Sequence, residues 1–258
     1  MEEVLGTSDL LRTTQVNIVK QSPEISRGVD KGGAGAQGIM VGYACDENDE
    51  YVPEEYRLAR SLCRHLYDKF PYDGKTQVTT RDDRNLFVVT SFQNVDKITL
   101  HAEVSEWLKG TDYGLRITHA NPAGDWNQGG FDADAGLTGR KLVVDNYGPR
   151  VPIGGGAYSG KDPSKVDRSA AYMARHIAKK ELIRKGLNEC WVYLSYAIGE
   201  REPLQMTCMD GYNNTWEIPS FYPGYPNEII DFLKLKEPIY YQTSEWGAYG
   251  NGFNWDKE

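Results

Sequence analysis

The chain has 258 residues, of which 40% are hydrophobic and 12% aromatic, and a formal net charge of -8. This composition predicts a packed globular protein, and the acidic balance argues against binding along a nucleic-acid backbone, which needs clustered Lys and Arg. No apolar run is long enough to cross a bilayer and the first residues lack the pattern of a signal peptide, so we expect a cytoplasmic protein with no membrane partner. The scattered cysteines, without a CxxC pair, predict free thiols: Cys45, Cys63, Cys190 and Cys208.

The predicted elements alternate between strands and helices along the chain. Residues 14–20 have the alternation of a strand, and the next five, 21–25, are typical of a turn. A helix is predicted over 53–69, with Pro53 in its first turn. Strand-like runs separated by Gly, Asp and Asn then follow at 76–80, 86–91, 97–104, 115–118 and 141–145.

The last third of the chain repeats this alternation. A helix is predicted from Asp167 to about Lys185, followed by a strand over 190–197. The aromatic-rich tail, 240–255, is typical of core or subunit packing. Strands grouped with intervening helices predict an α/β fold in which helices cover sheets.

Three segments combine glycine, basic residues and carboxylates in a way that a plain core does not require: 73–79, 134–141 and 154–168. Together they contain five cations, Lys75, Arg140, Lys141, Lys161 and Lys165. Two unit charges at about 4 Å attract each other by ~1 kcal/mol in water but ~4 kcal/mol at a partly buried site. Each lysine alone is also typical of a solvated surface, but the three segments together predict a polyphosphate site.

The backbone of these segments also suits an anion. Glycine allows close approach of the backbone to phosphate, and a helix that begins near Asp167 would direct free N–H groups toward it. Gly155, Gly160 and Lys161 have the spacing of a P-loop, but Asp162 stands where Ser or Thr would reach magnesium. Prolines flank the segment as well, so a P-loop is not favoured.

Residues 154–172, GGGAYSGKDPSKVDRSAAY, resemble the signature of the S-adenosylmethionine synthetase family. Other blocks resemble the family in the same order along the chain: QSPEI at 21–25, GAGAQGIMVGYA at 33–44, DGKTQVT at 73–79, NPAG at 121–124, DAGLTGRK at 134–141, SYAIG at 195–199 and KEPIY at 236–240. The resemblance extends from about residue 20 to the C-terminus, and implies that the whole chain is one region with interleaved central and C-terminal parts.

This resemblance implies a fold of three similar α/β units about a pseudo-threefold axis, one of them incomplete, and dimers with active sites between subunits. It implies an enzyme that forms S-adenosylmethionine from ATP and methionine with Mg²⁺ and K⁺, and that releases phosphate and diphosphate. The five cations would be the tripolyphosphate clamp and Asp167 a magnesium ligand. Asp134 would bind methionine or nucleoside, Trp126 would stack near adenine, Gln21 would line the methionine end, and Asp73 would lie beside the clamp.

The sequence departs from the family in four places. The family's N-terminal segment is absent, which predicts a second polypeptide that supplies it within a hetero-oligomer built on a dimer. Ala36 replaces an Asp expected near the methionine, the loop over 30–35 is short, and Asp125 replaces an Arg. Three hypotheses therefore stay open. The chain is a catalytic subunit, or it is a non-catalytic subunit, which either binds nucleotide or tripolyphosphate or regulates a synthetase. The third hypothesis is an unrelated ATP-binding kinase.

Overall fold

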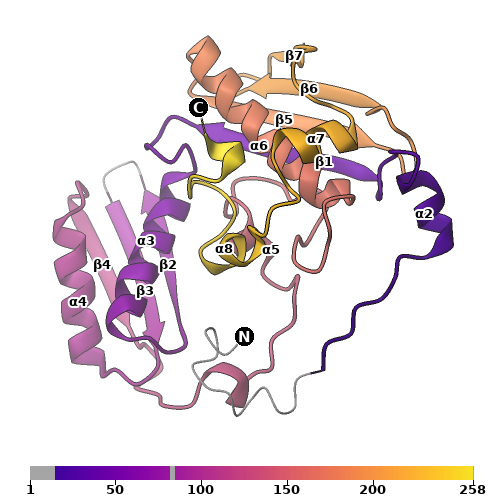
Figure 1. Cartoon of the computed structure of the whole chain (residues 1–258). Helices are drawn as coiled ribbons and strands as arrows, with labels where there is room; N and C mark the ends of the chain where they lie inside the picture. The colour runs from indigo at the N-terminus through magenta and orange to yellow at the C-terminus, as the bar shows by residue number, and fades with distance from the viewer. Residues whose placement is uncertain (1–14, 82–84, 258) are drawn as a thin grey trace.

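The computed structural model describes residues 15–81 and 85–257, which form two separate β-sheets with helices packed against them (Figure 1). The helices are α2 Pro23–Val29, α3 Glu54–Lys69, α4 Lys97–Lys109, α5 Leu142–Asp145, α6 Val166–Lys185, α7 Pro226–Phe232 and α8 Tyr240–Glu245, with 3-10 turns η2 Gly130–Asp132 and η3 Asn254–Asp256. The strands are β1 Gly38–Cys45, β2 Gly74–Arg81, β3 Asn85–Phe92, β4 Leu115–Ala120, β5 Glu189–Tyr196, β6 Gln205–Asp210 and β7 Thr215–Glu217. The predicted α/β layers are confirmed.

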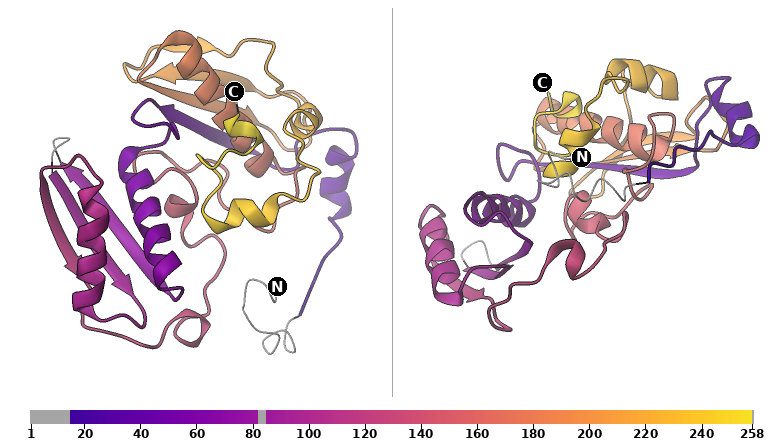
Figure 2. Two further views of the ribbon diagram at one scale, coloured as in Figure 1. Left: turned by 60° about the vertical axis from the view of Figure 1, so that its left-hand side comes forward. Right: turned by 60° about the horizontal axis from the view of Figure 1, so that its bottom comes forward.

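The larger sheet has the strand order β1-β5-β6-β7, and all neighbouring strands are antiparallel. Helix α6 covers one face of this sheet (Figure 2). Close packing depends on Gly42 in β1, because a Cβ there would lie 2.2 Å from the carbonyl oxygen of Ala174 in α6. Ala170 and Ala178 are also fully buried on α6. These small residues hold the helix tightly on the sheet and so fix the position of its N-terminal turn.

The smaller sheet has the order β2-β3-β4, in which β2 pairs antiparallel and β4 parallel with β3. Helices α3 and α4 cover one face, where Leu62 and Leu100 are fully buried in the same cluster as Leu86 and Val88 of β3. Side chains of β2 alternate between half-buried and exposed, and Lys75 is among the exposed ones. One face of this sheet is therefore core, and the other is polar.

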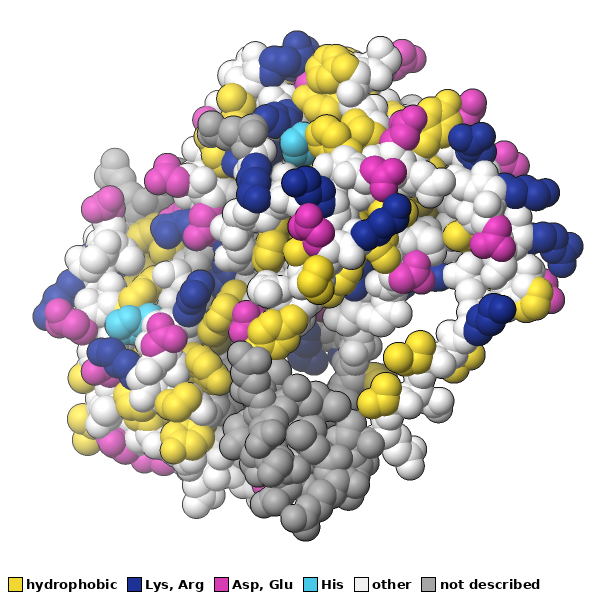
Figure 3. Space-filling model, viewed as in Figure 1, with side chains coloured by type: hydrophobic (Ala, Val, Ile, Leu, Met, Phe, Trp, Pro, Cys, Tyr) yellow, Lys and Arg dark blue, Asp and Glu magenta, His cyan; other side chains and the backbone are white. Residues whose placement is uncertain are grey.

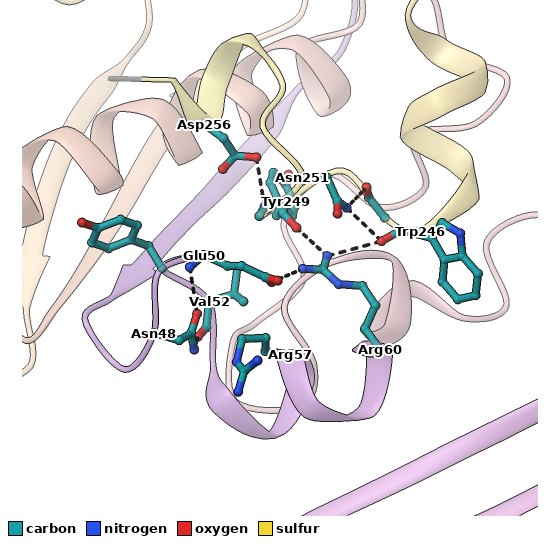
Figure 4. Close-up of polar contacts among 12 residues, drawn as sticks. Asn48, Glu50, Val52, Arg57, Arg60, Trp246, Tyr249, Asn251 and Asp256 are labelled. Carbon is teal, nitrogen blue, oxygen red and sulfur yellow. Dashed lines mark hydrogen bonds and ion pairs between the residues drawn. The ribbon is translucent and has the colours of Figure 1, made fainter. Parts of the chain in front are cut away.

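The C-terminal segment connects the two sheets. Trp255 is fully buried and stacks on Tyr172 of α6 with ring centroids 3.8 Å apart, so the predicted packing role of the aromatic tail is confirmed. From the other side, Arg60 of α3 donates a hydrogen bond of 2.6 Å to the carbonyl oxygen of Tyr249 and also pairs with Glu50 (Figure 4). This contact holds α3 against the C-terminal segment.

Two predicted strands are helices instead. Residues 97–104 belong to α4, because the Asp96 carboxylate accepts hydrogen bonds of 3.0 Å from the backbone N–H groups of Ile98 and Thr99 and starts a helix. Leu100, Val104 and Leu108 then fall on one buried face at helical spacing. Residues 141–145 likewise form the short helix α5 rather than a strand.

The N-terminal predictions were also wrong in part. Residues 15–20 form no strand, because no neighbouring strand pairs with them, and Ile18 is 91% exposed; residue 14 lies outside the described residues. The expected turn at 21–25 is the start of α2, with Ser22 as its N-cap and Pro23 in the first turn. The other predicted helices and strands are present, with ends shifted by a few residues.

Several surface properties agree with the composition. All four cysteines are free, three of them buried and Cys63 half-buried. On the face seen in Figure 3, basic and acidic side chains are interspersed. Among the described residues, no helix has the length and apolar content needed to span a bilayer.

Candidate functional site

A cavity of about 840 Å³ lies between α3, β2 and the C-terminal segment. All three glycine- and lysine-rich segments contribute to its wall: Lys75 from the first, Thr138 from the second and Tyr158 from the third. The C-terminal segment adds Trp246. The tertiary structure therefore brings the three segments to one cavity, although they are far apart in the sequence.

The third segment forms a closed loop before α6, the glycine loop (154–165). A Cβ at Gly155 would lie 2.4 Å from Oδ1 and 2.6 Å from Cα of Asp167, so only glycine lets the loop pass over the first turn of the helix. Lys161 folds back across this crossing, with Nζ 3.1 Å from the carbonyl oxygen of Gly155 and 3.3 Å from Oδ2 of Asp167. The predicted clamp cation and the predicted magnesium ligand are thus direct neighbours.

Lys165 lies in the next turn of the same loop. Its amine donates to the side-chain oxygen of Gln21 and pairs with Asp162 at 2.8 Å. Burial opposes ionisation of Asp162, but hydrogen bonds from Lys165 and Ser164 hold the pKa of its carboxyl below the usual value. Gln21 and Lys165, predicted to share a site, are therefore in contact.

The position of Ala36 follows from its neighbour. The N–H of Gly35 donates 3.0 Å to the carbonyl oxygen of Ser164, and a Cβ at Gly35 would lie 2.6 Å from that oxygen. Half-buried Ala36 follows directly and packs on the main core. The segment with the missing carboxylate thus lies against the loop that carries Lys161 and Lys165.

A second cavity of about 310 Å³ adjoins the first, and Lys75 lines both. Asp73 and Trp126 also line it, and the Asp73 carboxylate accepts a hydrogen bond of 2.9 Å from the N–H of Gly130. Three predicted site residues, Asp73, Lys75 and Trp126, therefore line the same cavity. Asp125, next to Trp126, accepts 2.8 Å from the N–H of Lys97 and so supports the start of α4.

Four predicted site residues contact one another in pairs around the start of α6 but line neither cavity: Gln21, Lys161, Lys165 and Asp167. Among the described residues, no charged side chain of the middle segment forms a hydrogen bond or ion pair with these four. Asp134, Arg140 and Lys141 are exposed, and none of the three lines either cavity. The backbone is nonetheless close, since a Cβ at Gly139 would lie 3.4 Å from Cβ of Ala157 in the glycine loop. The structure places this segment beside the site but leaves its charged side chains in solvent.

Comparisons with known proteins match nearly the whole chain. Residues 31–111 match the family model "S-adenosylmethionine synthetase, central domain", and residues 128–257 match "S-adenosylmethionine synthetase, C-terminal domain". The chain is 38% identical to the S-adenosylmethionine synthase of Parvibaculum lavamentivorans, over 94% of this chain and 72% of that one. The chain belongs to the S-adenosylmethionine synthetase family. A Myxococcus xanthus S-adenosylmethionine synthase is also 38% identical, over 94% of this chain and 70% of that one.

The fold comparison points to the same family. The chain is similar to the solved structure titled "Structure of an Unusual S-adenosylmethionine synthetase from Campylobacter jejuni", with a TM-score of 0.77 and 31% identity. The similar region covers 88% of this chain and 70% of that one. The P-loop alternative has no structural support, because irregular backbone precedes Gly155 and α6 begins only at Val166, beyond Lys161.

Sequence reasoning missed one prominent residue of the larger cavity. Arg168 lines the larger cavity, is only 6% exposed, and donates from Nη1 to the carbonyl oxygens of Tyr158 at 3.1 Å and Lys161 at 3.0 Å. The only available signal was its place in the family signature, one residue after Asp167. Burial of an arginine cannot be read from that pattern.

Proposed function

We propose that this chain forms the tripolyphosphate-binding part of a methionine adenosyltransferase. The observation that carries the proposal is the single cavity lined by all three glycine- and lysine-rich segments. In the reaction the methionine sulfur attacks the 5′ carbon of ATP, the C–O bond to the triphosphate breaks, and a sulfonium product and tripolyphosphate result. Water then cleaves tripolyphosphate to diphosphate and phosphate. ATP availability and free thiols favour a cytoplasmic location.

The leaving group is the difficult part of this reaction, because negative charge accumulates on the tripolyphosphate as the bond breaks. Lys161 and Lys165 are held near the start of α6 by the glycine loop, and Lys75 lines the cavity to which this loop contributes Tyr158. Fixed cations at these positions stabilise the developing charge without reorganisation. Arg140 and Lys141 would join the clamp when their segment turns toward the cavity, and Asp134 would accompany them toward the nucleoside or methionine.

The first turn of α6 fits one magnesium ligand. Mg²⁺ is commonly bound by one or two carboxylates together with substrate phosphates and water. The Asp167 carboxylate is 12% exposed and already faces the Lys161 amine, so it could hold the ion beside bound phosphate. Bound magnesium would neutralise part of the leaving-group charge. Among the described residues no group of three metal-binding side chains occurs, and we assign no residue to K⁺.

We further propose that a second polypeptide completes the site, in a hetero-oligomer built on a dimer. The segment from η2 to α5 supports this, because Phe131, Leu137 and Val144 are 64–76% exposed beside the cavity. Apolar residues grouped in this way are typical of a surface that another chain covers. In β1 the apolar residue Ile39 is 56% exposed and would contribute to a dimer contact.

Ala36 supports the alternative of a non-catalytic subunit that binds nucleotide or tripolyphosphate. Its neighbour Gly35 donates a hydrogen bond to Ser164 in the loop of Lys161 and Lys165. The family resemblance places a carboxylate at position 36 near the reacting methionine, and alanine supplies no charge. Either the second polypeptide provides an acidic group or the chain binds substrate without reacting it. The variant Ala36→Asp separates these possibilities, since a gain in rate indicates a site that lacks only this carboxylate.

A coupled assay for S-adenosylmethionine and phosphate tests the proposal. The chain is assayed alone and together with a polypeptide that corresponds to the part of the Parvibaculum relative outside the aligned region. We expect activity only in the mixture. Lys161→Ala should abolish it while assembly persists, whereas Lys236→Ala, whose side chain is 78% exposed and pairs with Asp231, is the control and should have no effect.

The possible outcomes separate the two parts of the proposal. Full activity of the chain alone would refute the requirement for a partner and leave the enzyme assignment intact. Tripolyphosphate binding without any product in the mixture, and no gain with Ala36→Asp, would favour the non-catalytic subunit. Full activity of Lys161→Ala would show that the glycine loop is not the phosphate site.

A further inference from the structure

The guanidinium group of Arg168 connects the glycine loop to the protein core. Besides its two bonds to the loop carbonyl oxygens of Tyr158 and Lys161, Nε donates 3.0 Å to the hydroxyl of Tyr172. The group also lies over the Tyr240 ring, with Cζ 4.2 Å from the centroid. Only 6% of the residue is exposed. An arginine whose donors bind in this way has a fixed position.

All of these partners are neutral. Among the described residues Arg168 has no carboxylate within ion-pair distance, and the adjacent Asp167 pairs with Lys161 instead. Arg175, two turns further along α6, is fully buried but is paired with Asp256 at 2.9 Å. A buried charge without a counter-ion is unfavourable unless an anion approaches it. The positive charge of Arg168 is thus available to an anion in the cavity that it lines.

The two carbonyl oxygens that Arg168 binds determine where the Lys161 side chain is held. Tyr158 and Lys161 are the two ends of one turn, since the N–H of Lys161 donates 3.1 Å to the oxygen of Tyr158. Holding both ends fixes where the Lys161 side chain leaves the backbone and keeps its amine near Gly155 and Asp167. If Arg168 were replaced, the turn would keep its own hydrogen bond and the Lys161–Asp167 ion pair but lose the two bonds that fix its backbone to α6.

We infer that Arg168 is a positioning residue that holds the Lys161 turn and, as a buried cation without a carboxylate partner, favours an anionic polyphosphate in the cavity. The inference rests on the proposed function for the identity of the anion. The attachment of the Lys161 turn by Arg168 does not depend on the proposed function. The two parts can therefore be measured separately.

The test compares Arg168→Lys with the matched control Arg175→Lys, which changes a buried arginine on the same helix that already has a counter-ion. Lysine keeps the charge but cannot bond two carbonyl oxygens in the planar arrangement of a guanidinium. Hydrogen exchange of the backbone over 155–165 is expected to be about tenfold faster in Arg168→Lys and unchanged in the control. The assembled protein should bind inorganic tripolyphosphate about tenfold more weakly only with Arg168→Lys.

Tyr172→Phe serves as a second variant if Arg168→Lys does not fold, because it removes only the acceptor of Nε. It should change exchange over 155–165 in the same direction by a smaller factor. Equal exchange in wild type and both variants, or an equal effect of Arg175→Lys, would overturn the inference. If wild-type protein does not bind tripolyphosphate, the proposed function fails, while the exchange result still decides the role of Arg168.

Discussion

Substitution of Gly155 by alanine is the sharpest test of how the site is built. The added Cβ would lie 2.4 Å from Oδ1, 2.6 Å from Cα and 2.7 Å from Cβ of Asp167. Ordinary contacts of this kind are 3.4–4 Å, so the loop and the first turn of α6 must separate by about 1 Å. The contacts include helix backbone, which cannot move away as a side chain tip can.

Two magnitudes follow from this displacement. Overpacking of a well-packed site costs about 1–3 kcal/mol, so Gly155→Ala should lower the stability of the fold by that amount. The same shift moves Asp167 away from the Lys161 amine, now 3.3 Å distant, and a displacement of about 1 Å in a catalytic arrangement can reduce the rate about 100-fold. We therefore expect a large loss of adenosyltransferase activity with a moderate loss of stability.

Thermal unfolding and the coupled activity assay of the assembled enzyme measure both effects. Gly110→Ala is the control, because Gly110 has an ordinary φ of -77° and a Cβ there would meet only the carbonyl oxygen of Trp107 at 3.4 Å. This change should leave stability and rate close to those of wild type. If Gly155→Ala behaves like Gly110→Ala in both assays, the close crossing of the glycine loop over α6 is not what positions the site.

Three further predictions concern pH, packing and nucleotide binding. Burial, together with the charge of Lys180, lowers the pKa of His176 from 6.5 to about 4. Between these two pKa values the unfolded chain binds more protons than the folded protein. The free energy of unfolding should therefore fall by about 2 kcal/mol from pH 7 to pH 5. Denaturant unfolding of His176→Gln should lack this loss; an equal pH dependence would contradict it. Trp255→Ala removes a fully buried ring and should cost about 3–5 kcal/mol in unfolding experiments, and a cost below 1 kcal/mol would be inconsistent with its stacking on Tyr172. Trp126→Ala should raise KM for ATP and not for methionine in the adenosyltransferase assay, and equal changes in both would remove Trp126 from the adenine site.

The sequence was sufficient where the chemistry depends on local pattern. The signature over 154–172 identified the family, and the helix that begins near Asp167 was predicted within one residue because its run of helix-forming residues is a local pattern. The same local reasoning failed at 97–104, where β-branched residues and leucine also fit a strand. The Asp96 cap and the burial of Leu100, Val104 and Leu108 on one face decided for a helix.

The arrangement of the site depends on contacts that no local pattern contains. The motifs determined the family, and they predict a polyphosphate ligand and the cations that would bind it. Only the tertiary structure decided that Lys75 shares a cavity with the glycine loop, and that Arg168 is buried beneath this loop without a carboxylate partner. The reason is physical: a residue type limits the chemistry available, whereas burial and the approach of distant segments arise from packing of the whole chain.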